Sequence, residues 1–376
     1  MQPTPLPNES PTLTSHFHRV RNHPWTPVAF FFAGFIFDAF LLHRPDTVLQ
    51  IAHQALYLFL LTLLLSAAIL ENYGLFSVSP RFKKIWHYHE HLTQFLLGTL
   101  LNVYAFFYFK SASLLSSIVF MLVVGGLLVA NDFVKLKDHQ ITLKLVLYFL
   151  CITSFWLYVV PMMIGYVGIV SFILALVVSN GFIYAIYGIA GRTATDKGAS
   201  MEAKRSIQKK ILGSGYGVLT AFALFYALAI IPPVPLSLQY MGIFHEVRKE
   251  NGEFILSHSR PFWKFWQNGD QTFLARPGDS VVAFVRVFAP RGFQDQLFVR
   301  WMLDTPRGWE KQDLIPITVN GGREEGFRGY TAKANYQPGL YRVQIVTTDG
   351  REVGRISLSI KPDESTEPRV YQELHQ

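Results

Sequence analysis

Two ionisable residues lie within long apolar stretches of the chain. Asp38 interrupts the stretch over 25–42, and His53 lies near the start of the next one, over 47–70. Only the short connection His43–Asp46 separates the two stretches, so we expect the two side chains at the same depth of adjacent helices. A hydrogen bond between them would lower the cost of burying either group. The pair is a candidate proton relay or ligand contact, with a structural clasp as the alternative.

A second concentration of polar residues is the run Trp86-His87-Tyr88-His89-Glu90-His91. His87 and His91 are four residues apart and would share one helix face, a spacing that can chelate a transition metal. The same face continues through Gln94 and Asn102, which predicts a polar stripe that points into a helical bundle. A metalloenzyme would need a third ligand, with His89 as the nearest candidate. One irregular cluster does not predict a metal, so we expect no cofactor and a structural or interfacial role.

A third candidate is the aromatic run Phe262-Trp263-Lys264-Phe265-Trp266. Trp263 and Trp266 would suit an exposed platform for a sugar ring, or a patch that contacts a membrane, because an indole combines an apolar face with a polar N–H. The alternative is that both pack in the core of a β-domain. Trp301 and Trp309 are expected in such a core.

Two kinds of element would position these residues, and the first kind is a set of apolar helices. A helix needs about 20 mostly apolar residues to cross the hydrocarbon of a bilayer. The run over 145–191 lacks charged residues and is too long for one crossing, so Pro161, Gly165 and Gly168 are expected to divide it. This predicts a seven-helix transmembrane bundle over 25–231, with spans over 25–42, 47–70, 92–109, 114–130, two within 145–191, and 211–231.

The charge of the chain is unevenly distributed. Of 34 Lys and Arg and 26 Asp and Glu, residues 1–231 hold 16 and 9, a net charge of +7, and the rest is almost neutral. Thirteen of the 16 basic residues fall on one side of the expected spans and two on the other, which predicts a cytoplasmic N-terminal tail over 1–24. The net charge of +8 therefore reflects topology, and we expect no nucleic-acid partner.

A basic segment precedes the last span. Ala203, Ile207 and Ile211 recur every four residues, as on the apolar face of a short helix over about 199–212. Such a helix would lie at the membrane surface, and a solvated linker is the alternative. The candidate contacts to lipid headgroups are Lys204, Arg205, Lys209 and Lys210.

The second element is a β-rich domain. A Pro-rich linker over 232–242 ends the helical pattern, and short strands with turn signals follow over 243–362. The clearest pair flanks Asp349-Gly350, a hairpin signal. We expect an antiparallel immunoglobulin-like β-sandwich and a disordered tail over 363–376. The expected strands are 281–288, 296–303, 313–319, 327–334, 340–347 and 351–360.

The sequence over 320–360 resembles the C-terminal module of an uncharacterised bacterial family. The residues that carry the likeness are Arg323–Tyr330, Gly339–Val343, Asp349–Arg351 and Gly354–Ile356. The resemblance implies a proteobacterial multi-pass inner-membrane protein with a periplasmic β-domain of unknown function, and it assigns no site residue.

Taken together, these features predict a non-enzymatic inner-membrane protein. Its partners would be the lipid bilayer and an envelope protein or glycan that the periplasmic domain binds, so that the protein acts as an anchor or a sensor. The alternatives are a small-solute or proton-coupled transporter that uses Asp38 and His53, and a membrane metalloenzyme built on the histidine cluster.

Overall fold

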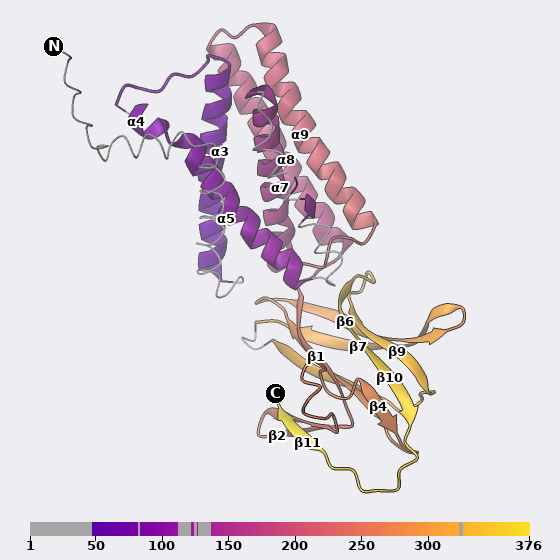
Figure 1. Ribbon diagram of the computed structural model, residues 1–376. Coiled ribbons are helices and arrows are strands. Elements are labelled where there is room, and N and C mark those ends of the chain that lie inside the picture. Colours follow the sequence, from indigo (N-terminus) through magenta and orange to yellow (C-terminus); the bar gives the residue numbers. More distant parts are fainter. Residues whose placement is uncertain (1–46, 82, 112–121, 124–125, 127–136, 323–325) are drawn as a thin grey trace, which may run out of the picture.

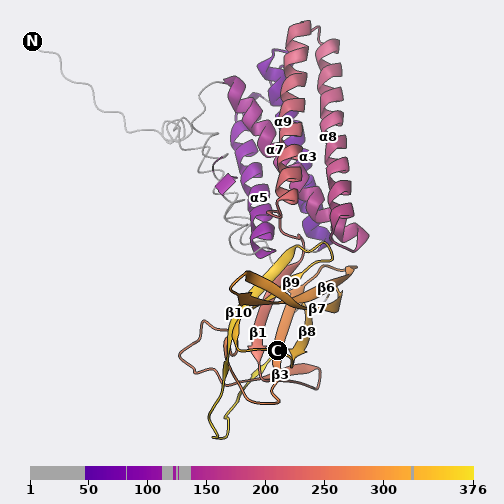
Figure 2. The same ribbon diagram turned by 90° about the vertical axis from the view of Figure 1, so that its right-hand side faces the viewer.

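The computed structural model describes residues 47–81, 83–111, 122–123, 126, 137–322 and 326–376. A bundle of helices occupies one end of the molecule and a β-domain the other (Figure 1). The view turned by 90° keeps the β-domain at the same end of the bundle (Figure 2).

The described helices account for part of the expected bundle. Four of them are long and apolar enough to cross a membrane, namely α3, α7, α8 and α9. The expected count of seven is not supported, because the first span, over 25–42, lies outside the described residues and so does nearly all of the fourth, over 114–130. The helices are α3 (Val48–Asn72), α4 (Lys83–Trp86), α5 (His89–Lys110), α7 (Lys137–Ile164), α8 (Ile169–Asp196) and α9 (Met201–Ala227).

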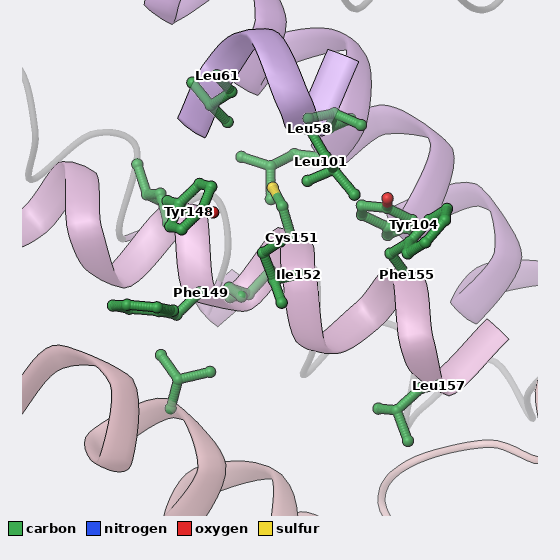
Figure 3. Packing of buried hydrophobic residues seen from close by; sticks show 14 of the residues in the cluster. Leu58, Leu61, Leu101, Tyr104, Tyr148, Phe149, Cys151, Ile152, Phe155 and Leu157 are labelled. Carbon is green, nitrogen blue, oxygen red and sulfur yellow. The ribbon is translucent and has the colours of Figure 1, made fainter. Parts of the chain in front are cut away.

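Helix α7 forms the centre of the bundle. Of its apolar window 83% is buried, against 28% to 33% for α3, α8 and α9. Figure 3 shows Cys151 and Phe155 of α7 packed against Leu58 of α3 and Leu101 of α5. The surrounding helices expose large apolar side chains, which is unfavourable in water and typical of lipid-facing helices. Those that are at least half exposed include Leu56, Phe59, Leu63, Ile173, Val177, Ile189 and Leu224.

The β-domain contains three sheets. Sheet β1-β5-β8 and sheet β4-β10-β9-β6-β7 enclose the main core, and a third sheet, β11-β3-β2, is attached. All strand pairs are antiparallel except β4 with β10. The strands are β1 (Ser237–Phe244), β2 (Glu246–Glu250), β3 (Glu253–His258), β4 (Thr272–Ala275), β5 (Val281–Phe288), β6 (Gln294–Thr305), β7 (Gly308–Asn320), β8 (Phe327–Lys333), β9 (Gly339–Val346), β10 (Glu352–Pro362) and β11 (Gln372–His375).

The C-terminal segment over 363–376, for which we expected no structure, carries strand β11. This strand pairs with β3. Arg369 holds the segment before it, because its guanidinium donates to Asp279 at 2.6 Å and to Asp363 at 3.1 Å. The segment thus closes over the edge of the domain.

The connection between α7 and α8 enters the β-domain. Val167 is buried in the main core of that domain, and the Gln294 N–H donates to the Gly165 carbonyl at 2.9 Å. Gly165 has a φ of +83°, and a Cβ there would lie 2.8 Å from the Gly292 oxygen. Only glycine fits both conditions.

The end of α9 makes a second contact with the β-domain. The Tyr226 hydroxyl donates to Asp349 at 2.8 Å, and the guanidinium of Arg351 lies over the Tyr226 ring at 4.6 Å. The other contact of this ring is Phe172 of α8, stacked at 3.8 Å. Residues 231–237, which include most of the Pro-rich segment, are all buried. Side-chain packing, in addition to the covalent connection, therefore holds the β-domain against the bundle.

Candidate functional site

An exposed aromatic loop over 259–271 lies between β3 and β4. Its four aromatic residues are 54% to 84% exposed, so the alternative in which Trp263 and Trp266 pack in the core is wrong. The two indoles lie 6.0 Å apart, and the Lys264 ammonium lies 5.1 Å from the Trp263 ring. Four neighbouring exposed aromatic residues form a patch of the kind that marks an interaction site. They are Phe262, Trp263, Phe265 and Trp266.

The base of this loop is fixed by Asp270. Its carboxylate accepts the Ser259 N–H at 2.9 Å and the Ser259 hydroxyl at 3.2 Å, which joins the two ends of the loop. Next to it, Gly269 bridges to Ile243 of β1, and a Cβ there would lie 2.0 Å from the Ile243 oxygen. The loop therefore presents its aromatic residues from a rigid base.

A buried histidine lies against this base. His245 Nε2 is 3.5 Å from the Asp270 carboxylate, and its ring stacks on Phe273 at 4.1 Å. Burial, with a further contribution from Arg369, lowers the pKa of His245 to about 4. Burial also raises the pKa of Asp270, although hydrogen bonds from Ser259 oppose this. At neutral pH the histidine is uncharged and acts as a packed support of the loop.

A first hollow of about 470 Å³ lies beside the loop, between the edges of β1 and β10. Trp266 forms one wall of it, and Asn268 and Gln271 add amide groups from the same loop. The remaining lining residues are Leu238, Gln239, Tyr240, Met241, Arg355, Ile356 and Ser357.

A second hollow of about 400 Å³ lies over the outer face of the five-stranded sheet. Trp309, 37% exposed, lines it, and the Arg342 guanidinium lies 4.1 Å from the centre of this ring. The remaining lining residues are Gln267, Gln271, Leu340, Tyr341, Ser357, Leu358 and Ser359.

The two hollows adjoin at Gln271 and Ser357, which line both. The Gln271 amide donates to the Ser357 carbonyl at 3.1 Å, which ties the loop to β10. Arg355 is the charged lining residue of the first hollow, and its guanidinium is neutralised by Glu352 at 2.5 Å. The joined hollows thus combine two indoles with amides and hydroxyls and have little net charge.

The sequence indicated part of this site. Trp266 lines a hollow as an exposed platform would, whereas Trp263 lies on the same loop and lines neither hollow. Trp309, expected in the core, is exposed, and Trp301 is fully buried as expected. The polar neighbours of Trp309 could have indicated that it is exposed, because Gly308 precedes it and Glu310-Lys311 follow it.

The expected pair of Asp38 and His53 is only partly within the described residues. Asp38 lies outside them, so its hydrogen bond to His53 stays a prediction. The described neighbour of His53 is Tyr57, whose ring centre lies 4.1 Å from the imidazole centre.

The histidine cluster does not form one helix face. α5 begins at His89, so His87 lies in the preceding turn, exposed, while His91 is half-buried. His89 stacks on Trp86 at 4.3 Å. Gln94 and Asn102 are buried in the bundle, as expected for its polar stripe. Among the described residues, no three His, Cys, Asp or Glu side chains lie close enough together to hold a metal ion.

The basic segment over 199–212 is the first half of α9 and is continuous with the rest of that helix. Ile207 and Ile211 are buried against the bundle. Lys204 donates to Thr195 of α8 at 2.7 Å, and the Lys210 ammonium lies 5.4 Å from the Tyr73 ring. Arg205 and Lys209 are exposed.

The geometry defines a class of protein: an apolar helical bundle that carries a docked β-domain with a solvent-open aromatic and polar site. Within the β-domain, residues 294–360 match a family described as "Protein of unknown function (DUF2914)". This match spans β6 to β10 and includes Trp309, Asp349 and Arg351. It agrees with the resemblance noted over 320–360.

Other comparisons are weak. Among curated proteins, none matches this chain. An immunoglobulin-like protein from Pseudomonas aeruginosa is 12% identical, and the match covers 34% of this chain and 98% of that one with a TM-score of 0.22. The alkylpurine DNA glycosylase AlkC from Pseudomonas fluorescens, bound to DNA, is 12% identical, with 94% and 100% covered and a TM-score of 0.17. Neither score supports an argument about this chain.

Proposed function

We propose that this chain is a non-enzymatic protein of a bacterial inner membrane whose periplasmic β-domain captures an envelope component. The observation that carries the proposal is the exposed aromatic loop beside two adjoining hollows. Such a combination is typical of binding sites, in which apolar walls supply contact area and a few polar groups fix orientation.

The direction of the helices supports a bundle of seven spans. The Lys144 ammonium near the start of α7 lies 3.5 Å from Glu90 at the start of α5, so both helices begin at the end of the bundle far from the β-domain. Tyr108, near the end of α5, lines a small space next to the β-domain together with Arg351. α5 therefore ends near the β-domain and α7 begins at the opposite end of the bundle, which agrees with the span expected over 114–130.

The charge distribution supports the orientation. The connection between α8 and α9 and the basic start of α9 lie at the end of the bundle opposite the β-domain (Figure 1). Basic residues concentrate on the cytoplasmic side of membrane proteins. The β-domain then lies in the periplasm. Its two packed sheets are compatible with the immunoglobulin-like sandwich that the sequence predicts.

Capture is tested with the full-length protein in detergent, immobilised and incubated separately with purified cell-wall sacculi and with periplasmic protein. The test variant replaces Phe262, Trp263, Phe265 and Trp266 with Ala. The matched control carries Leu314→Ala and Tyr330→Ala, two other exposed apolar positions of the same domain.

We expect the loop variant to retain about tenfold less of one component, while the control retains as much as the wild type. Equal retention by all three proteins, or retention by none, would overturn the proposal.

The orientation is tested by a reporter fused after Gln376 that is active only outside the cytoplasm. An inactive reporter would overturn the periplasmic assignment.

A further inference from the structure

We infer that the two adjoining hollows bind an oligosaccharide of at least two pyranose units, an assignment that rests on the function proposed above. Each hollow falls within the range of about 300–1,000 Å³ that small-ligand sites occupy. Since Gln271 and Ser357 line both, a ligand that fills both has to pass over this pair.

The polar lining suits sugar hydroxyls. Asn268 and Gln239 present planar amides, each with a carbonyl acceptor and two N–H donors, and Gln271 adds a third amide, which already donates to the Ser357 carbonyl. Such a group can accept from one hydroxyl and donate to its neighbour on the same ring. The hydroxyls of Ser357 and Ser359 on β10 can both donate and accept.

The two indoles supply the apolar half of the recognition. A pyranose has C–H groups on its faces and hydroxyls at its edge, so it stacks on an aromatic ring while its hydroxyls contact polar neighbours. Trp266 stands at the first hollow and Trp309 at the second. Arg342 packs on the Trp309 ring and holds its orientation. Each hollow thus has one aromatic platform and its own set of polar groups.

The same lining disfavours other ligand classes. In the first hollow an anionic ligand would meet no unpaired positive charge, because the guanidinium of Arg355, its charged lining residue, is bonded to Glu352. The core of a protein interface is apolar, whereas polar groups predominate on the surface of the first hollow. A protein partner would instead contact the tip of the loop, where Phe262 and Phe265 are 84% and 79% exposed.

The experiment titrates full-length protein in detergent with two series of soluble β-1,4-linked oligosaccharides, one of N-acetylglucosamine and one of glucose, with one to four units. Binding is followed by calorimetry and by tryptophan fluorescence. The two series distinguish a glycan whose sugars carry N-acetyl groups, as those of the cell wall do, from a plain polysaccharide. The variants are Trp266→Ala and Trp309→Ala, with Trp263→Ala as the matched control from the same loop.

We expect affinity to rise by about tenfold between one unit and three, because longer ligands reach both hollows. Trp266→Ala and Trp309→Ala should each weaken the binding of the trimer by about tenfold. Trp263→Ala should leave it within about twofold, because this indole lines neither hollow. If Trp309→Ala lowers the unfolding temperature, Trp309→Phe should fold normally and keep most of the affinity, since it preserves the platform.

The inference is overturned if neither series binds, if affinity is independent of length, or if Trp263→Ala weakens binding as much as Trp266→Ala. Failure here is distinguishable from failure of the proposed function. If the wild type binds no oligosaccharide but still retains an envelope component that the loop variant loses, the glycan assignment is wrong and the proposed function stands, with a protein as the captured component. If the wild type binds no oligosaccharide and the loop variant retains as much as the wild type, both proposals are wrong.

Discussion

The contact of the Asp349–Arg351 turn with the bundle can be tested by substituting Arg351. Its side chain is 10% exposed, and it donates to the Asp349 carboxylate at 2.8 Å. In Arg351→Met, Asp349 loses its countercharge and keeps the hydrogen bonds from Thr347 and Tyr226. The bond between Arg351 and Asp349 lies within the β-domain and persists when that domain undocks. The stacking of the Arg351 guanidinium on Tyr226 crosses the junction and contributes about 1 kcal/mol. We therefore expect docking to weaken by about 1 kcal/mol.

Limited proteolysis of the full-length protein within residues 228–242 measures this change. This segment is largely buried when the domains are docked, so cleavage reports the open population as long as reclosing is fast. A loss of about 1 kcal/mol raises the cleavage rate about fivefold. The matched control is Arg355→Met, an ion-paired residue of β10 whose partner is Glu352, and its rate should stay within about twofold.

The pH dependence of docking provides a second check. Burial acts to raise the pKa of Asp349, but the hydrogen bonds from Thr347 and Tyr226 and the charge of Arg351 outweigh it, so the pKa lies below its ordinary value. Its contribution is therefore complete above the pKa of the unfolded chain, about 4, and is lost as the pH falls through the lower folded value. Cleavage of the wild type should be constant from pH 5 to pH 8. Cleavage of Arg351→Met at the wild-type rate would refute the assigned contact.

Three further predictions concern stability. Gly165→Val should raise the same cleavage rate at least tenfold, because its side chain would collide with the Gly292 carbonyl and its φ is positive; an unchanged rate would contradict the described junction. Trp301→Ala should destabilise the β-domain by about 3–5 kcal/mol in urea unfolding, since the indole is fully buried, and a loss below about 1 kcal/mol would argue against this core. The pKa of His245 is about 4 in the folded protein against 6.5 in the unfolded chain, so between these values only the unfolded chain takes up a proton. Stability should therefore fall by about 3 kcal/mol as the pH drops from 6.5 to 4. His245→Gln should remove this contribution to the pH dependence.

The hairpin of β9 and β10 was predictable because the side chains of its two strands alternate. In β9, Tyr341, Val343 and Ile345 face the core, and the Asp349-Gly350 turn returns the chain along β10. Strand β1 lacks this pattern because Ile243 enters the main core while the adjacent Phe244 enters a second one. A strand covered on both faces gives no period of two.

The site was predictable only in part, because its groups meet through strand pairing. The sequence places Trp266 in an aromatic run, but it does not indicate whether a cluster of this kind is core or surface. Trp309 reaches the second hollow because the hairpin of β6 and β7 extends beside β9, where Arg342 meets its ring. Neither contact follows from local spacing, since 33 positions separate these two residues.

The position of β10 bears on whether this protein is an anchor or a moving sensor. The strand begins one residue after Arg351, which touches the bundle, and its residues Arg355 and Ser357 line the first hollow. A ligand can relay a signal only through an element that has two arrangements, each with its own affinity for the ligand. Here the junction is closed by Val167 in the core, by the Gly165 contact and by buried residues 231–237, which together define one arrangement. This docked arrangement is compatible with the anchor proposed above, which would hold its binding site at a fixed place relative to the bundle.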